Sequence, residues 1–344
     1  FMENSFVHLH AHTEYSMLDG AAKIEPFLNR ILELEQPGAA ITDHGNLYGA
    51  LEFYNSAIDK KLKPIIGYEA YVISDSRFER PDRKNNKRYH LTLLAENTEG
   101  YWNLVEMASK AFTEGYYYKP RIDYELLKKY SEGIIALSGC LGGEIAQLLA
   151  PDGSVEEGNQ GQTRSFDDAL KKAEFYQSIF GENNFFIELH KHGIKQQEDI
   201  LPDLLKISEK LSAPLVAAND SHYVHSDDAS AHDALLCVQT NATLDDENRF
   251  KFDGSGFYIK SSEEMRNLFP NEEFPNACNN TLKILDRVEY EFEKDTYYLP
   301  DFPIDDSNKN VDEYLKDKVY QGAEGLYGEP VSYTHLRAHE TLHN

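Results

Sequence analysis

The segment FVHLHAH at residues 6–12 alternates apolar residues with histidines, and this alternation predicts a β-strand with its histidines on one face. Other short runs, such as AAIT (39–42) and PLVAA (214–218), are apolar on both faces, as expected of strands that are covered on both sides. The pattern predicts seven strands, at residues 6–10, 39–42, 64–71, 89–95, 133–138, 184–190 and 214–219.

Amphipathic patterns between these runs predict helices at residues 23–35, 47–61, 99–114, 143–150, 166–180 and 196–211. A strand–helix repeat of roughly 30 residues predicts an α/β fold with a parallel sheet, either open or closed into a barrel. Seven units are one fewer than the usual barrel has.

The rhythm changes in three places. A polar excursion at 74–88 and an acidic, Gly-containing loop at 151–165 interrupt it, and the strands stop after residue 220. Helical patterns follow at 227–239, 261–269 and 276–288, and then a Pro-punctuated connector leads to a short helix at 311–322. We therefore expect a main domain at 1–288, the beginning of another domain at 289–328 and a doubtful, non-native tail at 329–344.

Composition limits the class of protein. The 344 residues carry a formal charge of −25, which argues against a general coat for nucleic acid or anionic membranes. No apolar run approaches the roughly 20 residues of a membrane span, and the first ten residues do not form a secretory signal. Three scattered cysteines do not form a disulfide framework. An acidic, soluble, cytoplasmic protein is expected.

Metal-ligand residue types stand near the ends of most predicted strands. In parallel α/β folds, sites form at the carboxyl ends of the strands, so these side chains are expected to meet. They are His8, His10, His12 and Asp19, then Asp43 and His44, then Glu69, His90 and Cys140, and finally Asp220 and His222.

Spacing supports the same site. His10 and His12, like Asp220 and His222, are two residues apart, so each pair shares one face of an extended chain. Spacing alone leaves His8 and His10 as an equally good pair. Mixed imidazole, carboxylate and thiolate ligands in this number exceed one tetrahedral ion and suit two or three divalent ions. Such ligands favour zinc or manganese, with iron as a further candidate.

Several motifs together resemble the polymerase and histidinol phosphatase (PHP) domain, and more narrowly the PHP domain that begins the alpha subunits of bacterial DNA polymerase III. They are FVHLHAHTEYSMLDG, AAITDHGNLYGALEFY, PIIGYEAYV, GYYYKPRID, ALSGCLGGEIAQ and ANDSHYV. The resemblance runs from about residue 5 to 288 and continues weakly to about 328, where the polymerase palm would begin. It implies a distorted seven-stranded, TIM-like β/α barrel with a trinuclear metal site and a short helical extension.

The resemblance also implies a ligand set and favours His10 with His12 over His8, which is expected to be buried. Asp19, Asp220 and His222 are implied to take part most directly in catalysis. The implied metal ligands are His10, His12, Asp19, His44, Glu69, His90, Cys140, Asp220 and His222.

The implied activity is a metal-dependent 3′–5′ exonuclease or phosphoesterase. Implied partners are a DNA primer end or single strand, the remaining polymerase domains, a proofreading subunit and other replisome components, with no membrane. No carboxylate motif of a polymerase palm follows, so this chain alone is not expected to polymerise DNA.

Two other functions fit the same motifs. One is a free-standing phosphatase on small phosphate esters, against which GYYYKPRID and the continuation after residue 290 argue. The other is a structural PHP domain that keeps its metals and docks a proofreading subunit, since structural sites need their ligands too.

Substrate contacts are sought in two segments. The excursion at 74–88 holds six basic residues, which predict either a solvated loop or an arm that steers phosphate: Arg77, Arg80, Arg83, Lys84, Lys87 and Arg88. Tyrosines followed by cations at 116–121 resemble platforms on which single strands stack. The candidate substrate-binding residues are Tyr117, Lys119, Arg121 and Arg88.

The remaining histidines and cysteines are not expected to bind metal. His190 and His192 are expected at the rim or facing substrate, and His225 and His232 at the surface or in helix packing. Cys237 and Cys278 are expected in the core. The tail holds His339-Glu340-x-x-His343, formally a zinc protease motif, but the chain ends one residue later and offers no third ligand.

Overall fold

The computed structural model describes residues 4–82, 85–150, 163–252, 254, 256–292, 296–304 and 309–328. The chain divides into two compact units, Phe1–Glu291 and Phe292–Asn344. The loop expected at 151–165 falls mostly outside the described residues, as do Arg83, Lys84 and the tail with its HExxH motif.

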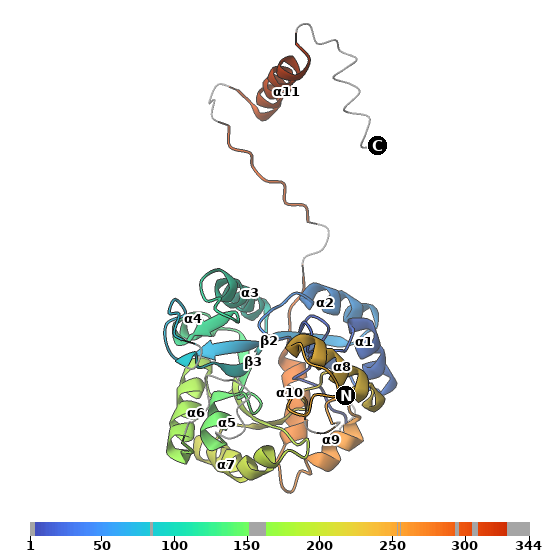
Figure 1. Cartoon of the computed structure of the whole chain (residues 1–344), viewed down its shortest axis with the longest axis vertical. Helices are drawn as coiled ribbons and strands as arrows, with labels where there is room; N and C mark the ends of the chain where they lie inside the picture. The colour runs from blue at the N-terminus through green and yellow to red at the C-terminus, as the bar shows by residue number, and fades with distance from the viewer. Residues whose placement is uncertain are drawn as a thin grey trace. The chain divides into compact units, whose positions relative to one another are not determined.

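A curled, seven-stranded sheet forms the centre of the first unit (Figure 1). Its strands follow the order β1-β2-β3-β5-β6-β7, and β4 pairs separately with β2. The predicted α/β class is confirmed; six of the seven predicted strands are present, and β4, which was not predicted, completes the seven. The strands are β1 (Gly38–Ile41), β2 (Lys63–Ile73), β3 (Tyr89–Ala95), β4 (Arg121–Asp123), β5 (Ile134–Leu137), β6 (Phe185–Leu189) and β7 (Leu215–Ala217).

The expectation of a wholly parallel sheet is wrong at one strand. β3 runs antiparallel to both β2 and β5, with Tyr71 opposite His90 and Thr92 opposite Leu137. A parallel return needs a crossover, usually a helix, whereas the segment that joins β2 to β3 contains no α-helix among its described residues. Because β3 is reversed, its beginning lies where the other strands end, and this brings His90 to their carboxyl ends.

The N-terminal segment joins the two edges of the sheet. His8 bridges to Ala39 beside β1, while Ala11 bridges to Ser221 just after β7. The amide of Ala40 donates to the carbonyl of His8 at 2.7 Å, and the amide of His12 donates to the carbonyl of Ser221 at 2.7 Å. This segment was predicted as the first strand. It makes isolated bridges rather than a regular strand, and these bridges connect it to β1 and to the segment that follows β7.

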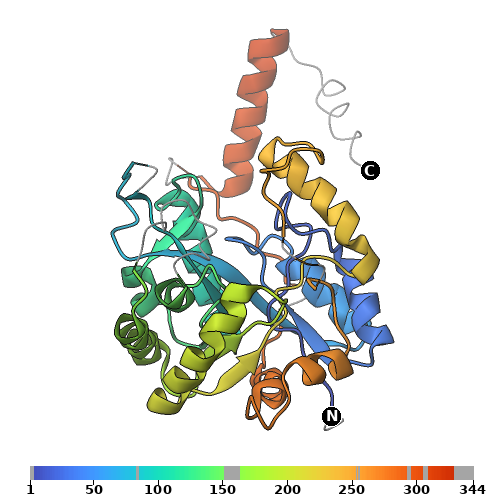
Figure 2. The same ribbon diagram turned by 60° about the horizontal axis from the view of Figure 1, so that its bottom comes forward.

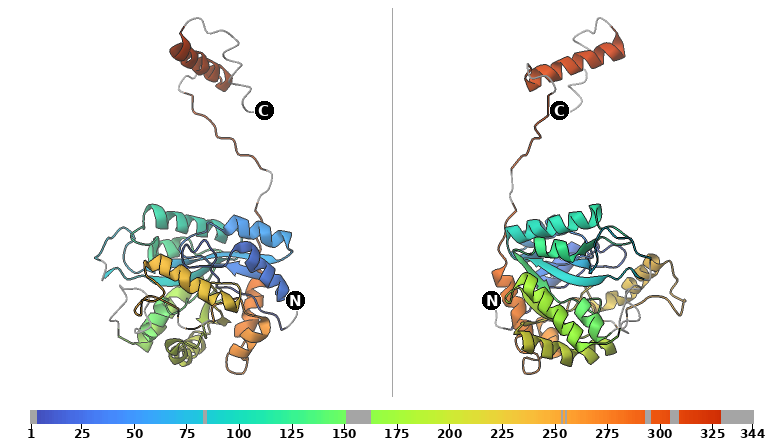
Figure 3. Two further views of the ribbon diagram at one scale, coloured as in Figure 1. Left: turned by 45° about the vertical axis from the view of Figure 1, so that its right-hand side comes forward. Right: turned by 90° about the vertical axis from the view of Figure 1, so that its left-hand side faces the viewer.

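Helices surround the sheet in the first unit (Figures 2 and 3). Each buries one stripe: α1 turns Ile24, Phe27, Leu28 and Ile31 inward at helical spacing. Local capping fixes several starts, as where Asn97 accepts from the amide of Gly100 before α3. The helices are α1 (Ile24–Glu33), α2 (Ala50–Asp59), α3 (Thr98–Thr113), α4 (Tyr124–Lys129), α5 (Glu144–Leu149), α6 (Phe166–Phe180), α7 (Lys195–Leu211), α8 (Ala229–Thr240), α9 (Ser262–Leu268) and α10 (Ala277–Arg287).

Two apolar clusters hold the unit together. The larger packs the outer face of the sheet against the helices. The smaller includes Ile65, Leu94 and Phe186 from three strands together with Ile284 and Leu285 of α10. Glu69, Thr92 and Glu188 stand an even number of residues from these strand positions, so they share the same faces. Polar groups are therefore carried inside the curled sheet, beyond an apolar layer.

The second unit contains α11 (Val311–Tyr327) among its described residues. Asn310 caps the helix by accepting from the amide of Glu313, whose carboxylate accepts in turn from the Asn310 amide. The helix extends five residues beyond its predicted end. In the described part of the chain, no helix combines the length and apolar character needed to cross a membrane.

Candidate metal centre

All nine residues expected to act as ligands converge on one end of the sheet. The N-terminal segment supplies His10 and His12, and the turn after it supplies Asp19. The strands and the segments that follow them supply the remaining six, which are His44, Glu69, His90, Cys140, Asp220 and His222.

Glu69 lies at the middle of the cluster and is buried. Its carboxylate oxygens lie 2.6 Å from Nδ1 of His44 and 3.0 Å from Nδ1 of His90. They also lie 3.4 Å from Nε2 of His10 and 3.6 Å from Sγ of Cys140. A single carboxylate thus touches residues from four separate parts of the chain.

Two aspartates extend the network. Oδ1 of Asp220 lies 3.2 Å from Nε2 of His12 and 3.4 Å from Nε2 of His10. Oδ2 of Asp19 lies 2.7 Å from Nε2 of His44 and 3.6 Å from Nε2 of His222. Each carboxylate thus contacts two histidines and brings negative charge among the candidate ligands.

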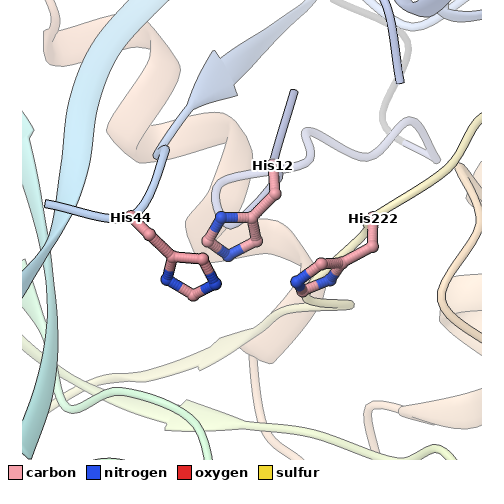
Figure 4. Close-up of side chains that lie close together, drawn as sticks. All are labelled: His12, His44 and His222. Atoms are coloured by element: carbon pink, nitrogen blue, oxygen red, sulfur yellow. The ribbon is translucent and has the colours of Figure 1, made fainter. Parts of the chain in front are cut away.

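Three histidine rings come together at the centre (Figure 4). His12 lies between His44 and His222, with ring centroids 4.1 Å and 4.3 Å away. One ring nitrogen from each of the three lies within 4.8 Å of the others, a spacing that allows one ion to be shared. Similar groups are formed by His10, His12 and Asp220, and by His44, Glu69 and His90.

The cluster contains buried polar atoms that lie close to one another, as Nδ1 of His44 and an oxygen of Glu69 do at 2.6 Å, without the geometry of a hydrogen bond. Buried polar atoms are normally paired, so a group of exceptions in one place needs an explanation. A divalent ion provides one, because it binds the lone pairs that a hydrogen bond would otherwise use. The atoms are Nε2 of His10, Nε2 of His12, Nδ1 of His44, Oε2 of Glu69, Oδ1 of Asp220 and Nε2 of His222.

The charges in the cluster keep its carboxylates ionised. Burial opposes ionisation of Asp220, but His10 and His222 outweigh it and lower the pKa of Asp220 well below its ordinary value. Burial likewise opposes ionisation of Glu69, and His90 and His44 lower its pKa well below the usual range. Anionic oxygens are therefore present at neutral pH, the form in which carboxylates bind metals.

His12 and Cys140 respond differently. Burial, with His44 and His222 beside it, lowers the pKa of His12 to about 3, so its ring is neutral and offers a lone pair. Burial and the charges of Glu69 and Asp220 raise the pKa of the Cys140 thiol. Cys140 therefore needs a cation nearby to ionise.

Backbone strain occurs at the same site. Asp220 has φ of 43°, in the left-handed region that is unfavourable for side chains other than glycine. Strain of this kind persists where surrounding contacts hold it in place, and it is common at functional sites.

Sequence reasoning did not identify Glu188, whose Oε1 lies 2.7 Å from Nδ1 of His10. Burial opposes its ionisation, but His10 and His190 lower its pKa to about 2. The signal was present: Glu188 is the one acidic residue in the apolar strand FFIEL. His190 is buried beside Glu188 at 3.1 Å rather than at the rim, where it was expected.

The other histidines and cysteines lie outside the cluster. His8 is buried, as expected, with Nε2 2.9 Å from the carbonyl oxygen of Lys260. His192 stacks on Phe257 with ring centroids 4.1 Å apart, so its ring packs within the fold. His232 packs in α8 and contacts the carbonyl of Asp19 at 2.8 Å. Cys237 and Cys278 are buried, which confirms their place in the core.

Arg121 was expected to contact substrate, and the structure contradicts this. The residue begins β4, and its side chain is 1% exposed. Its guanidinium donates to the carbonyls of Gly115, Arg77 and Glu79 and to the side chain of Asn86. All of these are acceptors within the fold, so Arg121 holds the neighbouring loops together.

The rest of the basic excursion is also largely bound within the fold. Arg77 is buried, with Nε 2.6 Å from Glu114 and Nη1 3.0 Å from Asp123. Arg80 donates to the carbonyls of Arg77 and Glu114. These two residues therefore bind other parts of the fold and do not form an arm that steers phosphate.

Among the other proposed substrate contacts, Lys119 is linked to the centre through Tyr71. Its Nζ lies 5.2 Å from the ring centroid of Tyr71, which is 5.2 Å from the ring of His90. Tyr117 is partly buried and donates to the carbonyl of Pro81 at 2.8 Å. Arg88 is also partly buried.

Comparison with known proteins gives a consistent result. A model of the PHP domain matches residues 8–192. The chain is 44% identical over 334 residues to the DNA polymerase III subunit alpha of Deinococcus radiodurans, a match that covers 94% of this chain and 24% of that protein. It is 41% identical over 324 residues to the same subunit of Borreliella burgdorferi, covering 94% of this chain and 27% of that protein.

The chain therefore spans about a quarter of the length of these relatives. A solved amidohydrolase from Chromobacterium violaceum matches with a TM-score of 0.36 and 13% identity, covering 64% of this chain and 88% of that one.

Proposed function

The chain belongs to the PHP domain family, and from this premise we propose that its nine-residue cluster binds two or three divalent metal ions and hydrolyses phosphodiester bonds at the 3′ end of a DNA strand. The relatives suggest the setting, which is the replicative polymerase of a bacterium. The ions proposed are zinc or manganese, with iron as a further candidate.

The observation that carries the proposal is the group of buried nitrogen and oxygen atoms that converge within 4.8 Å of one another, several of them without the geometry of a hydrogen bond. Neutral His12, together with ionised Glu69 and Asp220, supplies the mixture of lone pairs and negative charge that divalent ions need. The nine residues would hold the ions, and Glu69, Asp19 and Asp220 would supply the negative charge that offsets theirs.

Bound divalent ions would supply Lewis acidity, lowering the pKa of water and offsetting negative charge on phosphoryl oxygens. The protein's own residues would fix the geometry of the reaction. His10, His12 and Glu69 are buried and define the floor, whereas Asp19, His44 and Asp220 are partly exposed and mark the side from which substrate enters. Asp19, Asp220 and His222 are the proposed catalytic residues.

Two observations favour DNA as the substrate: the similarity to polymerase subunits and the position of the cation Lys119. Lys119 lies near Tyr71 and His90, at the edge of the centre, where it can meet a phosphate of a strand that leaves the site. Further proposed partners are the remaining polymerase domains, a proofreading subunit and other replisome components.

The test combines metal analysis with an exonuclease assay. The full chain is purified, its zinc, manganese and iron are measured, and it is given a 3′-labelled primer strand with and without chelator. We expect two or three ions per chain and loss of the labelled nucleotide that stops on chelation. Hydrolysis of a small phosphate ester, with the DNA left intact, would favour the phosphatase alternative. Bound metal with neither activity would make the site structural.

A further inference from the structure

Glu188 is a buried carboxylate inside the curled sheet, and its position needs a physical reason. A charge removed from water is costly unless it is paired and hydrogen-bonded. Oε1 of Glu188 lies 2.7 Å from Nδ1 of His10, while Oε2 accepts from the amide of Gly139 at 2.9 Å and from the hydroxyl of Thr92 at 3.3 Å. Both oxygens are thus fixed by contacts from the first segment, β3 and the turn that follows β5.

This contact determines which nitrogen of His10 carries the proton. A neutral imidazole has one N–H donor and one acceptor, and the hydrogen bond at one nitrogen sets the role of the other. When the ring is neutral, as a ligand to a metal ion must be, Nδ1 donates to Glu188 and Nε2 keeps its lone pair. That atom faces Asp220 and Glu69, at 3.4 Å from each.

We propose that Glu188 is a positioning residue, which holds His10 in the tautomer and orientation that present Nε2 to the metal centre. The inference rests on the proposed function, because it assumes that His10 binds an ion. Partners of this kind, which bond to the outer nitrogen of a ligating histidine, typically contribute 10- to 100-fold in metal affinity.

His190 completes the arrangement. Its Nε2 lies 3.1 Å from the same Oε1 that contacts His10, and its ring stands edge-on to the His10 ring at 5.6 Å. His190 therefore restricts rotation of the Glu188 carboxylate. It is buried, and it belongs to β6's continuation rather than to any segment that carries a proposed ligand.

A competing reading is that His10, Glu188 and His190 bind an ion of their own, since one atom from each lies within 4.8 Å of the others. The contacts disfavour it. Oε1 is already at hydrogen-bonding distance from Nδ1 of His10, and Oε2 accepts from Gly139 and Thr92, so no oxygen faces an open position.

The experiment measures Zn²⁺ affinity of the full chain by competition with a chromogenic chelator. Glu188→Gln keeps the shape of the side chain but removes its charge, and its amide can donate where the carboxylate accepted. We expect Zn²⁺ to bind about 10- to 100-fold more weakly. The matched control is Glu144→Gln, at a second buried glutamate whose contacts are Tyr124, Tyr176 and Lys172 rather than any of the nine residues. This variant should bind Zn²⁺ as the unsubstituted chain does.

A second readout does not depend on metal or on the variant folding. Nitrogen chemical shifts of the His10 ring, recorded on the metal-free chain at a pH high enough to leave the ring neutral, should show the single proton on Nδ1. Unchanged Zn²⁺ affinity in folded Glu188→Gln, a proton on Nε2 of the neutral His10 ring, or one Zn²⁺ fewer per chain in His190→Ala would each overturn the inference. If the unsubstituted chain binds no metal, the proposed function fails, while the ring shifts still decide whether Glu188 sets the tautomer.

Discussion

Asp220 combines an unusual backbone conformation with contacts to two of the proposed histidine ligands. Its backbone is strained at φ 43°, and its Oδ1 lies within 3.4 Å of both His10 and His12. Asp220→Asn removes the charge with little change in shape. We expect bound metal to fall and hydrolysis of a 3′-labelled strand to drop by about two orders of magnitude or more, because ions contribute several kcal/mol to such reactions.

The matched control is Asp246→Asn, which neutralises an exposed aspartate. Metal content and turnover of this variant should equal those of the unsubstituted chain. Full metal content together with full activity in Asp220→Asn would contradict the role assigned to Asp220.

Arg121 gives a prediction about stability instead of binding. Arg121→Ala leaves three backbone carbonyls and Asn86 without their donor and opens space in a buried region. Each unpaired buried group costs about 1–3 kcal/mol, so we expect the free energy of unfolding to fall by about 3 kcal/mol or more. Denaturant unfolding checks this.

Arg164→Ala is the comparison for Arg121, because Arg164 is an exposed arginine paired with Asp203 at 2.8 Å. Exposed pairs contribute roughly 0–1 kcal/mol, so this variant should unfold almost as the unsubstituted chain does. Equal losses in the two variants would show that the buried contacts of Arg121 add little.

Sequence reasoning succeeded at the residue scale where residue type and strand position agree. The nine expected residues do converge, because the ends of neighbouring strands at one edge of a curled sheet must lie close together. Arg121 failed for the opposite reason. The sequence around an arginine beside tyrosines is the same whether the guanidinium binds a phosphate or the carbonyl groups of neighbouring loops. Only the folded structure, in which Arg121 is buried, distinguishes the two.

At the scale of elements, the direction of β3 is the main feature that periodicity could not give. Apolar alternation reports that a strand exists but not which way it runs. The hint lay in the connection, since the excursion before β3 has no helical pattern and so lacks the usual crossover. Strand β4 was not predicted, because it has only three residues, two of them charged, and so shows no periodic pattern.

Helix α3 approaches the loop before β5 at a glycine, and this contact is testable. A Cβ on Gly100 would lie 1.7 Å from the carbonyl oxygen of Gly133. Gly100→Ala must therefore push the helix away, and we expect a loss of about 2 kcal/mol or more, measured by denaturant unfolding.

Gly325 in α11 provides the control, since a Cβ there meets no atom within 4 Å. Gly325→Ala should leave the unfolding of the first unit unchanged and favour its own helix slightly. A Gly100→Ala chain as stable as the unsubstituted one would mean that α3 can shift at no cost.

For the whole molecule, the metal centre links strands and turns that are distant in sequence. Ions that bind only the folded chain stabilise it by mass action, by about 4 kcal/mol at a thousandfold excess over the dissociation constant. Chelation should therefore lower the melting temperature by roughly 5 °C or more, and added metal should restore it. The same chelator should shift Asp220→Asn less. A melting curve that does not move after verified removal of metal would contradict this prediction.

The central claim is that nine side chains from across the chain hold a cluster of ions, and anomalous X-ray scattering from metal-loaded crystals tests it most directly. We predict two or three anomalous peaks among His10, His12, Asp19, His44, Glu69, His90, Cys140, Asp220 and His222, with ligand distances of about 2.0–2.3 Å. The absence of peaks at this position in crystals of chain shown to contain metal, or peaks bound by other residues, would contradict it.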